Sequence, residues 1–218
     1  RQRQMCIRDR SSADDSCYIV DDSAILMLCE EPKQEEYKRI IGQLKGNANM
    51  LESTIPELKE LKQSANVKNA LGVAYLRLRQ FDIAEGYLKE ALAVANSEEE
   101  KACILTNMGE CRLYLEDDEG YADYIAEASE KQVNDPVMHL VLKSNLLLKD
   151  LNEKEEFIKV IAEAKKMLKE EKKLLGSNQF IGIFNDRTLA TACYASDNMK
   201  KCDYYICLLY TSDAADEL

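Results

Sequence analysis

The stretch from residue 66 to residue 95, NVKNALGVAYLRLRQFDIAEGYLKEALAVA, restricts the fold of this 218-residue chain more than any other. Its first half carries an apolar stripe at the helical period, formed by Val67, Ala70, Leu71, Ala74, Tyr75 and Leu78. A second stripe follows the break at Arg79-Gln80 and is formed by Ala84, Tyr87, Leu88, Ala91, Leu92 and Ala95. Because neither helix can bury its stripe alone, the stretch predicts two helices that pack against each other and against neighbours.

Small residues stand where these two helices must approach each other. Gly72 lies inside the first predicted helix, where glycine costs about 1 kcal/mol relative to alanine. Close approach of a second backbone is one reason for a chain to accept that cost, and Ala84 in the second helix is small enough to permit it. The sequence therefore predicts that the helices cross where Gly72 meets Ala84.

The spacing of large, small and aromatic positions resembles that of a tetratricopeptide repeat. The positions that carry the resemblance are Leu71, Gly72, Tyr75, Phe81, Ala84, Leu88 and Ala91. Two positions depart from the family pattern, because Lys68 stands where the family has a tryptophan-type residue and Asn96 stands where it has a proline. The resemblance implies an all-α fold in which antiparallel helix hairpins stack as an α-solenoid.

The same register returns three times, less clearly each time. The matching positions are Met108, Gly109, Tyr121, Ile125 and Ala128, then Asn145, Leu148, Phe157, Ile161 and Ala164, then Leu189, Ala190, Cys193, Met199, Cys202 and Ile206. In the first of these returns the bulky Tyr121 occupies the small position of the second helix. We therefore expect TPR-like repeats over residues 64–206, preceded by an N-terminal helical segment over residues 11–63 that has the size of a degenerate repeat.

Local signals place further elements. Helices are predicted over residues 35–45 and 48–63, the second kinked or restarted at Pro56. The Asp21-Asp22-Ser23 run is predicted to cap a short helix over residues 24–31. Ser97 and Glu100 have the spacing of a capping box.

Both ends of the chain have an unusual coding property. Residues 4–9 can be encoded by CAG ATG TGT ATA AGA GAC, and the reverse complement, read one base shifted, contains CTC TTA TAC ACA, which encodes residues 208–211. Two termini encoded by opposite strands of one DNA segment indicate a sequencing adapter. We therefore expect residues 1–10 and 207–218 to be adapter-derived scars on a fragment translated from an environmental read.

Composition narrows the function classes. The formal net charge of −11 is unchanged when the two adapter stretches are left out, and it argues against nonspecific nucleic-acid binding. No apolar run approaches the length of a membrane span.

Four cysteines fall inside amphipathic helices, namely Cys103, Cys111, Cys193 and Cys202. This position predicts reduced, packed cysteines in a cytoplasmic chain. No metal or cofactor is expected, because His139 is the only histidine and the cysteines form no CxxC pair.

The function expected from these features is binding, because no nucleophile–base set, phosphate loop or metal set that would indicate an enzyme is present. Stacked helix hairpins offer a concave face that suits an extended peptide or a protein segment. The residues predicted to face this groove are Asn69, Val73, Leu76, Arg77, Thr106, Glu110 and Leu113.

The resemblance also implies a groove chemistry in which Lys, Arg and Asn clamp a peptide's terminal carboxylate. Asn107 fits one such position, but Val73 stands where another asparagine is needed, so an adaptor for chaperone tails is not expected. Two alternatives to a plain scaffold stay open. One is the peptide-sensing repeat domain of a bacterial transcriptional or phosphatase regulator, whose effector domain lies outside this fragment. The other is a structural assembly subunit.

Overall fold

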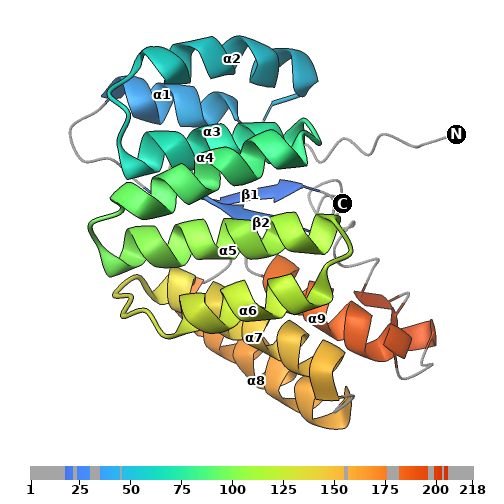
Figure 1. Cartoon of the computed structure of the whole chain (residues 1–218). Helices are drawn as coiled ribbons and strands as arrows, with labels where there is room; N and C mark the ends of the chain where they lie inside the picture. Colours follow the sequence, from blue (N-terminus) through green and yellow to red (C-terminus); the bar gives the residue numbers. More distant parts are fainter. Residues whose placement is uncertain are drawn as a thin grey trace, which may run out of the picture. The chain divides into compact units, whose positions relative to one another are not determined.

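The computed structural model describes residues 18–21, 24–29, 35–44, 46–154, 157–175, 182–195, 199–202 and 204–205. The two stretches assigned to adapter sequence, and Ile206 of the last predicted repeat, lie outside these residues. The described chain is predominantly helical, which confirms the expected helical class, and it also contains one short β-hairpin (Figure 1). None of its helices is both long and apolar enough to cross a membrane.

The elements follow one another in a simple order. They are β1 (Tyr18–Asp21), β2 (Ala24–Met27), α1 (Glu35–Gln43), α2 (Ala48–Glu60), α3 (Ala65–Arg77), α4 (Phe81–Val94), α5 (Glu98–Tyr114), α6 (Asp118–Ser129), α7 (Pro136–Lys154), α8 (Phe157–Leu175) and α9 (Gly182–Ala195). The chain divides into two compact units at Leu142–Lys143, inside α7. We call residues 11–142 the N-terminal unit and residues from Lys143 onward the C-terminal unit.

In the N-terminal unit, contacts join α1 to α2, α2 to α3, α3 to α4, α4 to α5 and α5 to α6. Figure 1 shows these helices as a stack, with the β-hairpin drawn between α4 and α5. A single hydrophobic cluster runs through the unit from Leu26 in β2 to Cys111 in α5. The helices of the N-terminal segment, α1 and α2, therefore pack onto the α3–α4 pair through α2.

The crossing of α3 and α4 lies where the small residues predicted it. A Cβ atom added at Gly72 would come within 2.7 Å of Leu88 Cγ and 3.4 Å of the Ala84 carbonyl oxygen. At the corresponding place in the next pair, a Cβ at Gly109 would lie 3.0 Å from Ile125 Cδ1. Gly72 thus allows α3 to approach α4 closely, and Gly109 allows α5 to approach α6. The approach of α3 to α4 is the closer of the two.

The turns inside these two pairs are also alike. Arg79 (φ 60°) and Glu116 (φ 57°) both have left-handed backbone. The N–H of Gln80 donates to the Tyr75 carbonyl at 2.9 Å, and the N–H of Asp117 donates to the Arg112 carbonyl at the same distance. Each bond spans six residues and closes a Schellman motif at the end of a helix. The pairs α3–α4 and α5–α6 therefore share the same turn geometry.

We expect Glu116→Gly to raise the free energy of unfolding by up to about 1 kcal/mol, because glycine adopts positive φ without the strain that a Cβ atom imposes. Urea denaturation followed by circular dichroism would measure the change. Glu116 is exposed, whereas the guanidinium of Arg79 lies 4.4 Å from the centre of the Tyr114 ring. Arg79→Gly should therefore gain less, and a loss of stability in Glu116→Gly would contradict the assignment of strain.

Two local predictions have clear outcomes. The capping box at the start of α5 is confirmed, because the Glu100 N–H donates to Ser97 Oγ at 3.0 Å and the Ser97 N–H donates to the Glu100 carboxylate at 3.2 Å. Pro56 does not restart a helix, since α2 continues through it as one element.

The short helix predicted over residues 24–31 is wrong. Residues Ala24–Met27 form strand β2, which pairs antiparallel with β1 in the register Tyr18↔Met27 to Asp21↔Ala24. The run that follows Ser23, AILMLC, is apolar at every position and has no polar side that a surface helix would turn to water. A strand buries both of its faces with such a sequence, and Leu26, Met27 and Leu28 are at most 1% exposed.

In the C-terminal unit, α8 packs against α9. Their shared hydrophobic cluster contains Ala164, Leu189, Ala190, Cys193, Cys202 and Tyr205. The Ser144 and Thr188 hydroxyls lie 3.2 Å apart and are buried, which links α7 to α9 within this unit. Several positions of the weaker predicted repeats are therefore buried, although Met199 is 46% exposed.

Candidate functional site

The residues predicted to line a groove lie mostly in the interior. We use the name inner face for the surface of α3 and α5 that is centred on Asn69 and Asn107 and contacts β2. Among the predicted groove residues, those with no exposed surface are Asn69, Val73, Leu76, Thr106 and Glu110. Arg77 and Leu113 are half-buried. Five of the seven predicted residues are therefore buried, and this part of α3 and α5 is covered and not open.

Strand β2 covers the inner face through the main chain of Met27. The Met27 N–H donates to Asn107 Oδ1 at 2.7 Å, and the Met27 carbonyl accepts from Asn107 Nδ2 at 2.7 Å. Asn69 Nδ2 donates to the same carbonyl at 3.0 Å, and Asn107 Nδ2 also donates to Asn69 Oδ1 at 2.7 Å. All three residues are at most 1% exposed, so these bonds form away from water.

The carboxamide of Asn107 bonds to both polar groups of a single residue. An antiparallel neighbour strand makes the same pair of bonds, because it exchanges N–H and C=O with the residue opposite. Asn107 therefore replaces one residue of a neighbouring strand. This recognition requires an extended backbone with a free N–H, and it does not depend on the side chain at position 27.

Apolar contacts and a second main-chain contact complete the site. Leu26 and Leu28 belong to the same hydrophobic cluster as Val73 and Leu76 of α3. Past the end of β2, the carbonyl oxygen of Cys29 accepts from the Tyr37 hydroxyl at 3.1 Å. The inner face, together with Tyr37 of α1, thus holds residues 26–29 by burying leucines and by bonding to main-chain groups.

Arg77 has a structural role here. Its guanidinium donates to the carbonyl oxygens of Leu44 and Gly46, at 2.9 Å for Gly46. These carbonyls follow the end of α1, where partial negative charge favours a cation. Charge reversal at Arg77 would disturb the packing of α1 as well as any bound partner, so it is a poor test of partner binding.

Sequence reasoning missed the pairing of Asn107 with Met27. Every residue from Asn69 to Leu76 and from Ala102 to Cys111 is buried in the structure, and the sequence contains a signal for this burial. Several positions beyond the predicted stripes, such as Val73, Leu76 and Ile104, are apolar. A helix that is apolar around most of its circumference predicts burial on more than one side. The partner on that side could not be read from local sequence, since Met27 and Asn107 lie 80 positions apart.

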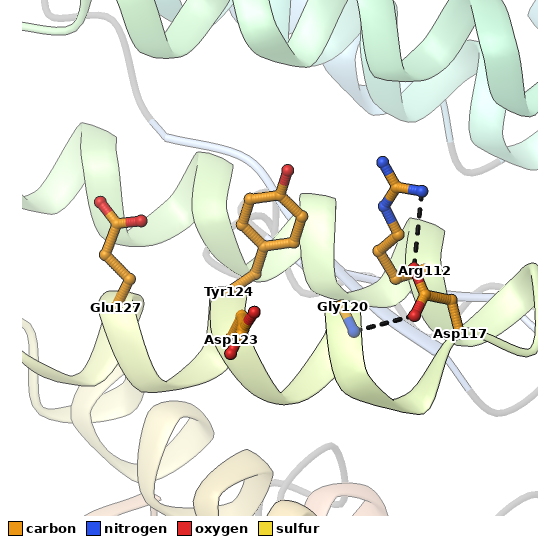
Figure 2. A pocket seen from close by; sticks show the side chains of 6 residues that line it. All are labelled: Arg112, Asp117, Gly120, Asp123, Tyr124 and Glu127. Atoms are coloured by element: carbon orange, nitrogen blue, oxygen red, sulfur yellow. Dashed lines mark hydrogen bonds and ion pairs between the residues drawn. The ribbon is translucent and has the colours of Figure 1, made fainter.

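A surface pocket of about 410 Å³ lies on α5 and α6 and is lined by Arg112, Asp117, Gly120, Asp123, Tyr124 and Glu127 (Figure 2). Several of its polar groups bond to neighbouring parts of the chain. The Asp117 carboxylate accepts from the Gly120 N–H at 2.9 Å and lies 3.6 Å from the Arg112 guanidinium. Arg112 also pairs with Glu85 of α4. These contacts anchor the start of α6 and its junction with α4.

Two side chains beside this pocket, Glu85 and Cys111, have shifted pKa values. A hydrogen bond from Lys89 and the charge of Arg112 lower the pKa of the Glu85 carboxyl. Burial, together with the charge of Glu85, raises the pKa of the Cys111 thiol to about 11. At neutral pH the Cys111 thiol is therefore protonated and weakly nucleophilic.

Within the described residues, no group of three or more His, Cys, Asp or Glu side chains is arranged to hold a metal ion. The chain matches no protein-family model, and no curated protein or solved structure matches it significantly.

Proposed function

We propose that this chain is a protein-interaction module that binds an extended segment of a partner protein on its inner face. The observation that carries the proposal is the set of hydrogen bonds that Asn69 and Asn107 form with the main chain of Met27. A surface that already holds one extended strand through main-chain bonds has the chemistry to hold another strand of similar shape.

The repeat architecture supports this proposal. The pairs α3–α4 and α5–α6 share a glycine at the crossing and a Schellman turn with positive φ. We regard them as TPR-like repeats that stack as an α-solenoid, with α3 and α5 as the inner helices. Such stacking generates an extended binding surface, because equivalent helices of successive repeats lie side by side.

The bound segment has a definite chemistry in this proposal. Asn107 needs an extended residue with an N–H, so proline is excluded at the central position. The residues on either side are aliphatic, like Leu26 and Leu28, because they enter the hydrophobic cluster of the unit. Each such side chain contributes about 1.5–3 kcal/mol when it is fully buried.

A synthetic peptide tests the proposal directly. The peptide DSAILMLSEE copies residues 22–31 with serine in place of Cys29, and it can carry a fluorophore for anisotropy titration. It is titrated into the full chain and into a strand-weakened variant, Leu26→Ser/Leu28→Ser, which retains the main chain but lacks two of the buried side chains. We expect binding to the variant, and no binding of the matched peptide DSAILPLSEE, which lacks the central N–H.

Asn107→Leu, added to the strand-weakened variant, should weaken peptide binding about 30-fold, because two hydrogen bonds of about 1 kcal/mol each are lost. Asn134→Leu is the matched control, since Asn134 is exposed and bonds to Glu99 at 2.9 Å. Failure of the folded strand-weakened variant to bind DSAILMLSEE would refute the proposal. A scaffold and a peptide sensor both need this binding step, so the experiment tests what they share.

A further inference from the structure

We infer that residues 24–29 are an internal competitor for the partner segment, so the partner must displace the chain's own strand before it binds. The inference rests on the proposed function and adds the regulation of the same site. It implies that the partner supplies an uncharged, aliphatic, extended segment resembling the strand that it replaces.

The contacts of the strand with the helices are of a kind that another peptide can reproduce. Within the described residues, the helices bond to the N–H and C=O of Met27 and to the C=O of Cys29. A side chain of the strand segment also bonds to a helix, because the Cys29 thiol lies 3.8 Å from the Glu99 carbonyl oxygen, to which it donates. The remaining contribution comes from leucine and methionine side chains, whose burial is not directional. An incoming segment therefore needs only a similar apolar pattern.

The strand is also separable from the helical core. Most members of the hydrophobic cluster of the N-terminal unit belong to helices, and β2 supplies Leu26 while Leu28 follows it. Strand β2 pairs with β1 over only four residues, and a two-stranded hairpin is marginal without support. The order of residues 24–29 consequently depends on docking to α5, and the conformational entropy lost on ordering opposes that docking.

Competition inside one chain has a measurable consequence. The apparent dissociation constant of an external peptide rises in inverse proportion to the fraction of molecules whose inner face is open. Attachment to the same chain gives the strand a high effective concentration, so this fraction is small. Weakening the strand should raise the affinity for an external peptide without any change in the inner face.

The first test compares the two titrations with DSAILMLSEE. We expect the strand-weakened variant to bind the peptide at least about tenfold more tightly than the unaltered chain does. If the unaltered chain and the strand-weakened variant bound the peptide with equal affinity, and Asn107→Leu weakened both, the inference of an internal competitor would be overturned. The proposed function would still hold. No binding to either folded protein would refute the proposed function itself.

The second test uses the unaltered chain and does not require any variant to fold. Displacement frees the thiol of Cys29, so its alkylation by iodoacetamide should accelerate with peptide concentration and then saturate. Peptide mapping by mass spectrometry resolves this cysteine from the others, and the buried Cys111 is the internal control, whose rate should not change. A Cys29 rate that is independent of the peptide would overturn the inference.

Sedimentation of the unaltered chain completes the test, because a second copy could supply the strand. We expect a monomer whose mass changes only by that of the peptide. A dimer that the peptide dissociates would overturn the assignment of an internal competitor, since the strand would then be exchanged between copies.

Discussion

Gly72→Leu is expected to lower the free energy of unfolding of the N-terminal unit by about 4 kcal/mol. A Cβ atom at this position would already lie 2.7 Å from Leu88 Cγ and Cδ2, and Leu88 has no exposed surface into which it can move. A leucine side chain adds further atoms to the same crossing, so α3 and α4 must separate. Urea denaturation of the full chain, followed by far-ultraviolet circular dichroism, measures the loss.

Two other glycines are controls for the Gly72 experiment. Gly86 lies inside α4 with no atom within 4 Å of an added Cβ, so Gly86→Ala should raise the free energy of unfolding by about 1 kcal/mol through helix propensity. Gly109→Ala should be nearly neutral, since Ile125 Cδ1 is 3.0 Å away at the end of a flexible side chain. If Gly72→Leu were tolerated as well as these changes, the close crossing of α3 and α4 would be ruled out.

Asn107→Leu is expected to lower the free energy of unfolding by about 3 kcal/mol. The leucine has a similar size, but it removes the partner of the Met27 N–H and the donor to Asn69 Oδ1, and all three residues are buried. Each buried polar group that loses its partner costs about 1–3 kcal/mol. In the variant, β2 can instead leave the inner face and become solvated. The free energy of unfolding lost in Asn107→Leu should therefore not exceed the free energy with which the strand docks.

A double-mutant cycle tests this limit. When the strand has already been weakened by Leu26→Ser/Leu28→Ser, Asn107→Leu should cost clearly less than it does in the unaltered chain. The exposed control Asn134→Leu should change the free energy of unfolding by less than about 0.5 kcal/mol. Strict additivity of Asn107→Leu with the strand changes would show that Asn107 stabilises the chain independently of β2.

Asn107→Asp adds a pH dependence with a definite sign. The carboxylate would face the carbonyl of Met27 and Oδ1 of Asn69, both acceptors, so the folded state favours the protonated acid. The folded chain then binds more protons than the unfolded chain above the ordinary aspartate pKa of about 3.9. Stability of this variant relative to the unaltered chain should therefore decrease as pH rises from about 4, and the reverse trend would contradict the geometry.

Local sequence was sufficient for the helix pairs. The stripes on residues 66–95 and the small residues Gly72 and Ala84 indicated α3, α4 and their crossing, because helical period and side-chain size act within a few turns. The capping box of Ser97 and Glu100 was predictable for the same reason, since its partners are three residues apart. The predicted groove residues lie on α3 and α5, in a region that is largely buried.

Local sequence was not sufficient to predict that β2 covers the inner face. The run AILMLC at residues 24–29 is apolar enough for a buried helix turn or a buried strand, and nearby residues favoured a helix cap. The strand is selected by a partner 80 positions away, because Asn107 offers both hydrogen bonds that an extended Met27 requires. Helix pairing depends on contacts that are near in sequence, whereas closure of the inner face depends on a contact that exists only after the chain has folded.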